Sequence, residues 1–242
     1  MFLTAEELIE LTGRQTRPAQ ARALTTLYLG GIQHVDGAVG ALLDRVAASP
    51  RGSRTAIVIA GDHGEEFMEH GLYGHGHSLY QELVHVPLWI QPPAEWAGGS
   101  WRGRQVDEPV STGQIAETVA PWAGLAPDPA ALPGLSAALR GEGVAGAPVR
   151  SETRKRGAFT VAVRSGDLKV VRVQKGRRAP RYLTFNLAAD PGEARDLGGV
   201  DPVLNAMADG FVGELRATPR FSGARVGREE VERLRALGYL DH

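Results

Sequence analysis

The chain has 242 residues, 43% of them hydrophobic, and a formal net charge of −1 at pH 7. This length suffices for a hydrophobic core and two subdomains, and the balanced charge points to neither an acidic nor a basic partner. The absence of cysteine excludes disulfide bonds, and no apolar run approaches the roughly 20 residues that span a bilayer. The first residues lack the basic start and apolar core of a signal peptide, so the compartment stays open.

Two helices are predicted before the first strand. Residues 4–12 begin with Thr4-Ala5-Glu6-Glu7, which is typical of a helix cap and first turn. A long helix is predicted from about Pro18 to Ala48. One of its faces should pack on a sheet, because apolar residues recur there at helical spacing. These residues are Leu24, Leu27, Ile32, Val35, Val39, Leu42, Leu43 and Val46.

The first predicted strand is Thr55–Ala60, an apolar run rich in β-branched residues. Such a run favours a buried strand of a parallel sheet. Asp62 and His63 follow at its carboxyl end, where sheets of this kind place their ligands. A carboxylate oxygen and an imidazole nitrogen are metal donors, so the sequence predicts half of a metal site here. Val86–Gln91 is predicted as the next strand, ended by Pro92-Pro93.

The segment between these strands is the most informative part of the chain. Residues 61–87 hold five of the seven histidines and carry glycines that allow a bound group to approach the backbone. His70 and His85 favour structural or solvated roles. Glu65 could orient His63 by a hydrogen bond without binding the metal itself.

The second half of the chain predicts a smaller unit. A short strand near Val110 should lead into a helix that Ser111 or Thr112 caps and that runs to Ala123. Residues 124–149, rich in Ala, Gly and Pro, indicate an extended connection with one short helical turn. A small antiparallel sheet and two last helices should follow. The strands are Phe159–Val163, Leu168–Val173 and Tyr182–Asn186, and the helices are Pro202–Ala217 and Arg228–Leu237.

Three pieces of residues 61–88 stand in an order that resembles the sulfatase family of the alkaline phosphatase superfamily. They are Gly61-Asp62-His63-Gly64, Gly71-Leu72-Tyr73-Gly74-His75, and the segment from Ser78 to Leu88 (SLYQELVHVPL). Further strings resemble the family at residues 28–36, 162–169, 185–193 and 237–239. The resemblance covers nearly the whole chain, but only the C-terminal half of a family member.

This resemblance implies a fold class of α/β type, with a partial, mostly parallel sheet flanked by helices as in alkaline phosphatase. Residues 1–149 would be the C-terminal portion of the catalytic domain, and residues 150–242 a small antiparallel subdomain with terminal helices. It also implies sulfuric ester hydrolysis with a divalent cation, most often Ca²⁺, held by Asp62 and His63. His75 or His77 would then protonate the departing alcohol.

The resemblance also exposes what the chain lacks. Family members carry paired metal-binding aspartates and a Cys/Ser-x-Pro/Ala-x-Arg segment whose first residue becomes the formylglycine nucleophile. This chain has no cysteine and no such segment. We therefore expect it to bind metal weakly and to turn over nothing on its own. The expected partners are a sulfate-ester or phosphate-ester substrate and an N-terminal half, or a second copy pairing with open strand edges.

Alternatives remain open at this stage. Asp62 could be a helix N-cap, and the loop histidines could bond only locally. A phosphotransferase or phosphodiesterase of the same superfamily would also use Asp-His here, with a Thr or Ser nucleophile. A non-catalytic remnant that serves as an interaction module would explain the missing nucleophile. No basic surface with interleaved aromatic residues indicates nucleic acid.

Overall fold

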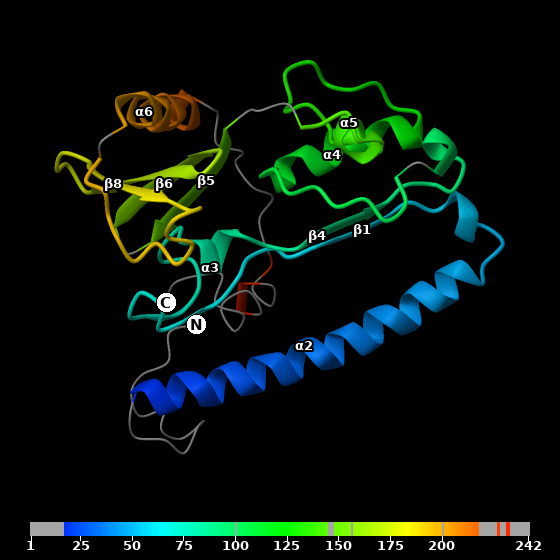
Figure 1. The fold of residues 1–242 in the computed structure, drawn as a ribbon, viewed down its shortest axis with the longest axis horizontal. Coiled ribbons are helices and arrows are strands. Elements are labelled where there is room, and N and C mark those ends of the chain that lie inside the picture. Colours follow the sequence, from blue (N-terminus) through cyan, green and yellow to red (C-terminus); the bar gives the residue numbers. More distant parts are fainter. Residues whose placement is uncertain are drawn as a thin grey trace.

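The computed structural model describes residues 17–99, 101–144, 148–155, 157–199, 201–217, 227 and 231–232. In Figure 1 the long helix α2 (Arg17–Ala47) runs beside a ribbon of two strands, β1 (Ile57–Ala60) and β4 (Leu88–Gln91). A four-stranded sheet with one helix above it lies near one end of this ribbon, and a group of short helices lies along it. The helix expected at 4–12 lies outside the described residues. Of the helix expected at 228–237, residues 231 and 232 are described, and both are helical.

Helix α2 confirms the predicted position of the long helix, but its expected packing is wrong. Gln20 is the one buried residue within it. The apolar side chains along it are exposed: Leu27, Leu29, Ile32, Val35 and Leu42 are each 49–58% accessible. The edge-to-face pair of Tyr28 and Phe67, 5.2 Å between ring centroids, is one contact that joins α2 to residues 61–87, the histidine loop. Of the predicted apolar face, Leu27, Ile32, Val35 and Leu42 are exposed, whereas Leu24, Val39, Leu43 and Val46 are partly buried.

Strands β1 and β4 lie where the sequence predicts strands, but they are neither parallel nor fully buried. They pair antiparallel, with Ile57 opposite Gln91 and Ala60 opposite Leu88. The segment that joins them holds no crossover helix, only β2 (Glu66–Phe67), β3 (Tyr73–Gly74) and the four-residue helix α3 (Gln81–Val84). A chain that turns back without a crossover brings the next strand in antiparallel. Among the described residues each strand has one neighbour, so both are edges.

The middle of the chain is built from short helices. The 3₁₀ helices η1 (Gly52–Arg54) and η2 (Trp96–Gly99) flank the β1–β4 ribbon in sequence. Next come η3 (Thr112–Gln114), α4 (Ile115–Val119), η4 (Ala120–Ala123) and α5 (Ser136–Arg140). The predicted cap is confirmed as a capping box: Ser111 Oγ accepts from Gly113 N at 3.1 Å, and Gln114 Oε1 accepts from Ser111 N at 2.9 Å. The strand expected near Val110 is irregular backbone instead.

The small antiparallel sheet is confirmed, with one additional strand. Its order is β5 (Val149–Lys155), β6 (Ala158–Ser165), β7 (Leu168–Lys175) and β8 (Arg181–Asn186). Sequence reasoning missed β5 because its residues, VRSETRK, are mostly polar. Gly166, with φ of 57°, supplies the left-handed backbone that the tight β6–β7 turn requires.

Both faces of this sheet are packed. Helix α6 (Pro202–Ala217), with the predicted bounds, covers one face. Its Leu204, Ala208 and Val212 pack on the inward valines of β6 and β7, which are Val161, Val163 and Val170. On the opposite face, Leu79 from the histidine loop joins a buried cluster with Ala162, Val171, Phe185 and Leu187. The sheet is therefore the surface on which the histidine loop is mounted.

Candidate metal centre

A short hairpin sets the geometry of the histidine loop. Strands β2 and β3 pair with Glu66 opposite Gly74 and Phe67 opposite Tyr73. Extending this antiparallel register by one position places Glu65 across from His75. A shift by one residue would turn both side chains to the other face, so the register decides which residues meet.

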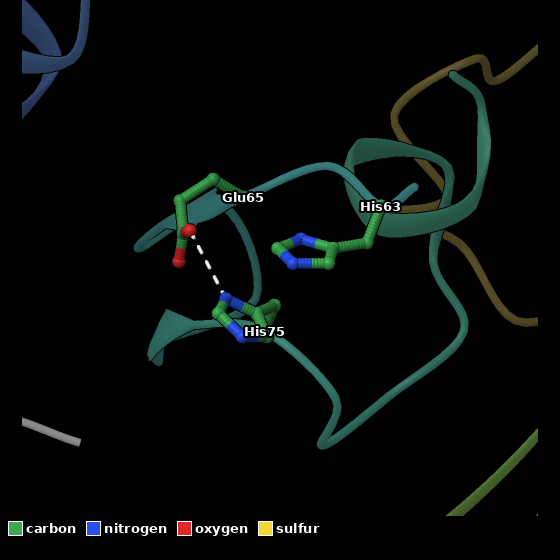
Figure 2. A group of neighbouring side chains, drawn as sticks. All are labelled: His63, Glu65 and His75. Carbon is green, nitrogen blue, oxygen red and sulfur yellow. Dashed lines mark hydrogen bonds and ion pairs between the residues drawn. The ribbon is translucent and has the colours of Figure 1, made fainter. Parts of the chain in front are cut away.

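Three side chains meet at the open end of this hairpin (Figure 2). His63, Glu65 and His75 each offer one donor atom, and these atoms lie within 4.8 Å of one another. Glu65 Oε2 lies 3.1 Å from His75 Nδ1. The rings of His63 and His75 stack with centroids 3.8 Å apart and an interplanar angle of 27°. Two imidazoles and a carboxylate so placed could hold a metal ion.

Asp62 lies beside this trio and outside it. Its Oδ1 accepts from the backbone N–H of His63 at 3.0 Å, and its Oδ2 lies 3.8 Å from His63 Nε2. Its side chain is 74% exposed, against 32% for His63. The structure thus brings Asp62 and His63 near each other, and joins His63 to Glu65 and His75 as well. Metal binding by Asp62 and His63 stays a prediction.

His63 and His75 are oriented by local hydrogen bonds. Nδ1 of His63 lies 2.8 Å from the Gly64 carbonyl oxygen, an acceptor, so this nitrogen is the donor, and in the neutral ring Nε2 then carries the lone pair. Burial is the largest influence on His75 and lowers its pKa. The neighbouring His63 lowers it further, while the hydrogen bond to Glu65 opposes the shift. His75 therefore favours the neutral form, which can coordinate a cation.

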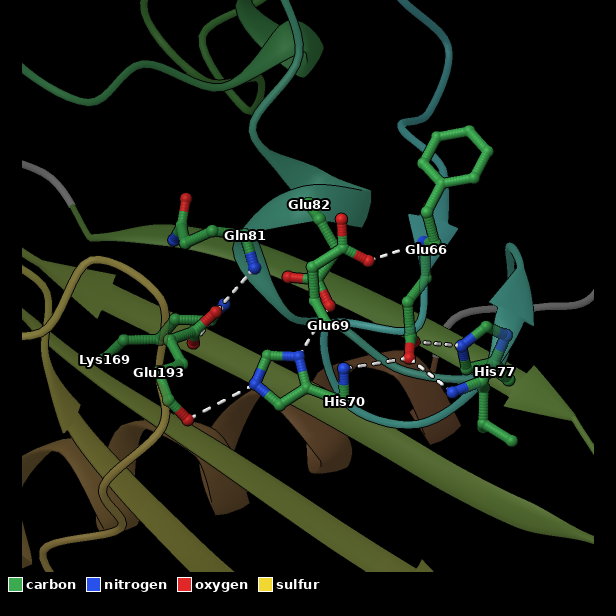
Figure 3. Close-up of polar contacts among 10 residues, drawn as sticks. Glu66, Glu69, His70, His77, Gln81, Glu82, Lys169 and Glu193 are labelled. Atoms are coloured by element: carbon green, nitrogen blue, oxygen red, sulfur yellow. Dashed lines mark hydrogen bonds and ion pairs between the residues drawn. The ribbon is translucent and has the colours of Figure 1, made fainter. Parts of the chain in front are cut away.

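The two candidates for proton transfer occupy different environments. His75 lies in the trio with its side chain 18% exposed. His77 is 4% exposed, and its Nε2 lies 2.6 Å from Oε2 of Glu66, a carboxylate that is fully buried. Glu66 Oε1 also accepts from the backbone N–H groups of Leu72 at 2.7 Å and His70 at 3.1 Å. The buried Glu66 carboxylate thus holds the β2–β3 loop together through hydrogen bonds to His70, Leu72 and His77 (Figure 3).

A second set of buried polar groups ties the loop to the small sheet (Figure 3). Lys169 Nζ of β7 lies 2.8 Å from Glu193 Oε1, with side chains 2% and 0% exposed. Glu193 Oε2 accepts from the backbone N–H of Gln81 at 2.5 Å. His70 links Glu82 of the loop to Glu193, with Nδ1 2.7 Å from Glu82 Oε1 and Nε2 3.3 Å from the Glu193 carbonyl oxygen. The expectation of a structural His70 fits these contacts, and His85 is exposed.

Sequence reasoning missed Glu66 and the Lys169–Glu193 pair. Both partners of that pair lie within strings that resembled family segments, residues 162–169 and 185–193, but nothing in the sequence linked one string to the other. For Glu66, the available signal was its position inside the histidine loop, where acidic residues looked solvated. Burial and hydrogen bonding of a carboxylate depend on contacts with residues four to eleven positions away.

A large cavity adjoins the candidate centre. Its volume is about 1130 Å³, and its lining includes Asp62, His63, Trp101, Arg104 and Arg164. The metal-binding candidates at the end of β1 therefore face a space large enough for a sugar-sized ligand. No helix in the described part of the chain is both long and apolar enough to cross a membrane.

His70 gives a pH-dependent prediction. Burial alone would lower its pKa, but the hydrogen bond and charge of Glu82, the Glu193 carbonyl and the charge of Glu66 together raise it above the ordinary value. A raised pKa in the folded state stabilises the protein fully below the unfolded value of about 6.5, and this contribution disappears as the pH rises through the folded value. H70N should therefore destabilise the chain more at about pH 5.5 than at about pH 8.5.

Urea denaturation of the wild-type chain and H70N at both pH values measures this difference. H34N removes an exposed histidine of α2 and serves as the control, with little change expected at either pH. Equal destabilisation by H70N at the two pH values would contradict the prediction.

Comparison with known proteins places the fold. The chain aligns with the solved structure of BT1596, a 2-O GAG sulfatase, at a TM-score of 0.57 and 22% identity over 89% of this chain and 48% of that one. It aligns with BT4656, solved in complex with its substrate D-glucosamine-2-N,6-O-disulfate, at a TM-score of 0.62 and 20% identity over 81% of this chain and 41% of that one. The fold is therefore the alkaline-phosphatase-like fold of these neighbours.

Sequence comparison supplies the family. Residues 6–125 match the family model Sulfatase. A delta 4,5-hexuronate-2-O-sulfatase of Bacteroides thetaiotaomicron is 27% identical over 243 aligned positions, which cover 89% of this chain and 47% of the relative. The chain belongs to the sulfatase family, as the resemblance predicted. It spans less than half the length of each of these three relatives.

Proposed function

We propose that this 242-residue chain is part of a metal-dependent sulfatase that hydrolyses sulfuric esters. The observation that carries this proposal is that Asp62 and His63 lie side by side in the lining of a large cavity, and that His63 also stacks on His75, in a chain of the sulfatase family. Asp62 Oδ2 and His63 Nε2, 3.8 Å apart, fit around one cation with metal–ligand bonds of about 2.3–2.6 Å. When bound, a cation such as Ca²⁺ would neutralise negative charge on the sulfate oxygens.

His75 is the residue proposed to protonate the leaving alcohol; because its lowered pKa favours the neutral ring, it would first take up a proton at Nε2. Charge develops on the ester oxygen as its bond to sulfur breaks, and a general acid at that point lowers the barrier. Glu65, 3.1 Å from Nδ1, holds the ring so that Nε2 is directed away from the carboxylate. His77 is less suited to this role, because its ring is buried against Glu66 and 4% exposed.

The remaining parts of the active site would come from outside these residues. Ca²⁺ takes six to eight oxygen ligands, whereas Asp62 and His63 supply two donors. The chain has no cysteine that could become a formylglycine nucleophile. Polypeptide equivalent to the unmatched portion of the relatives would supply both. It would also cover the exposed apolar side chains of α2, which include Leu27, Ile32 and Val35.

A sulfated sugar is the proposed substrate class. The support comes from the relatives, whose names give a hexuronate sulfate and a glucosamine disulfate, and from the cavity beside the centre. Arg104 and Arg164 in its lining supply positive charge for an anionic group.

Two preparations test this function. The 242-residue chain alone should bind Ca²⁺ weakly, more weakly still as D62N, and should not hydrolyse an aryl sulfate. The chain coexpressed with polypeptide covering the unmatched portion of a relative should hydrolyse aryl sulfate, and H75A should reduce kcat by about 10²–10⁴. Turnover by the chain alone would contradict the incomplete site. Hydrolysis of phosphate esters but not sulfate esters would favour the phosphotransferase alternative, and a folded but inactive assembly would favour an interaction module.

A further inference from the structure

We propose that His63, Glu65 and His75 together form a binding site for a borderline divalent cation such as Zn²⁺, with a ligand set different from the Asp62–His63 pair assigned to Ca²⁺. This inference goes beyond the proposed function, because it gives Glu65 a role as a ligand and predicts a metal that competes with catalysis.

The geometry of the trio carries the proposal. The β2–β3 register sets Glu65 opposite His75, and stacking sets His63 against His75. Glu65 Oε2 and His75 Nδ1 are 3.1 Å apart. Two donors on a tetrahedral ion with bonds of about 2.0–2.2 Å are separated by about 3.4 Å, so this pair needs little adjustment. The third donor, on His63, lies within 4.8 Å of the others and would reach the same ion once its ring turns out of the stack with His75.

The surroundings also suit a metal ligand set. His63 Nδ1 donates to the Gly64 carbonyl oxygen, which leaves Nε2 able to coordinate and fixes the ring. The three side chains are 18–32% exposed, so an ion could enter from solvent and would lose much of its hydration.

The donor types select the class of ion. Two imidazole nitrogens and one carboxylate oxygen are the protein ligands of many zinc sites, with a fourth position left for water. Calcium prefers a larger set of oxygen atoms at longer distances. Asp62, whose side chain is 74% exposed and turned toward the His63 backbone, lies outside the trio. The two ions therefore share His63 and differ in their second ligand.

Occupancy of the trio would have a functional consequence. A cation held by His75 removes this ring from proton transfer, and one held by His63 excludes Ca²⁺ from its neighbour. Zn²⁺ bound here would therefore inhibit the sulfatase proposed above rather than assist it.

Binding measurements on the whole 242-residue chain test the site. Co²⁺ serves as the spectroscopic probe, because its visible absorption bands reveal nitrogen and oxygen ligands in a four-coordinate site, and Zn²⁺ should displace it. E65Q should weaken Zn²⁺ binding by about tenfold or more while changing Ca²⁺ binding less than twofold. D62N should do the reverse. H85A, which removes an exposed histidine, controls for Zn²⁺ bound elsewhere.

The outcomes are separable. Circular dichroism of E65Q and D62N confirms that each variant folds, and E65D, with a shorter carboxylate, gives a second test at the same position by weakening binding without abolishing it. Unchanged Zn²⁺ affinity in E65Q, or equal loss of both ions in D62N, would overturn the proposal. Failure of Ca²⁺ binding or of sulfate hydrolysis, with Zn²⁺ binding intact, would count against the proposed function alone.

Discussion

Replacement of Lys169 by methionine is expected to lower the free energy of unfolding by about 3–5 kcal/mol. Methionine fills a similar volume but leaves the Glu193 carboxylate buried without the Lys169 ammonium and bound to the Gln81 N–H. An unpaired buried charge costs far more than the net value of the intact pair. Burial lowers the pKa of Lys169 and Glu193 opposes this shift, so the ammonium depends on its partner to stay charged.

Three variants make the measurement specific. K175M changes an exposed lysine at the end of the same strand and should alter stability by less than about 0.5 kcal/mol. The double variant K169M/E193Q removes both charges and should recover part of the loss, because no charge is then left alone. Chemical denaturation of all three gives the comparison. A loss below about 1 kcal/mol in K169M would show that the pair is not buried as described.

Glu66→Ala is the second substitution with a large expected effect, a loss of about 3–4 kcal/mol. The substitution removes the hydrogen-bond partner of the backbone N–H groups of His70 and Leu72 and of the ring nitrogen of His77, all of which bind the Glu66 carboxylate inside the loop. Each buried donor without a partner costs about 1–3 kcal/mol. Because Glu66 neighbours Glu65 and lies opposite Gly74, its loss should also loosen the register that brings Glu65 to His75.

Glu66→Gln separates hydrogen bonding from charge. The amide oxygen can still accept both backbone N–H groups, and the amide NH₂ can donate to the other tautomer of His77. We expect a smaller loss, about 1 kcal/mol. E142Q, in an exposed pair with Arg140, is the control and should change stability little. If Glu66→Ala lowered the free energy of unfolding, measured by urea denaturation, no more than E142Q does, the hydrogen bonds of Glu66 would not stabilise the loop.

Local patterns were enough for many parts of this fold. The bounds of α6, the capping box at Ser111 and the hairpin β6–β7 follow from residues close in sequence, whose spacing and turn chemistry act locally. The position of α2 follows for the same reason. Its packing did not, because helical spacing marks an apolar face without saying what covers it.

Long-range geometry decided the rest. The antiparallel direction of β1 and β4 depends on how residues 61–87 turn back. The sequence did not predict it, because an apolar run occurs in parallel and antiparallel strands alike. Asp62 and His63 were placed together by adjacency, whereas Glu65 joined His75 only through the register of the hairpin. The proposal of His75 rather than His77 for proton transfer likewise rests on the burial of the His77 ring against Glu66, which the sequence does not show.

The amino-acid sequence by itself determined the sulfatase family, the local elements and the segment that bears the candidate centre, because these follow from residue types at short spacing. The tertiary structure alone decided which side chains share a partner. Glu193 meets Gln81 across 112 positions and His70 across 123, and both contacts exist only because the four-stranded sheet packs against the loop. Burial of a charge or a ring is a property of that packing, and no local pattern specifies it.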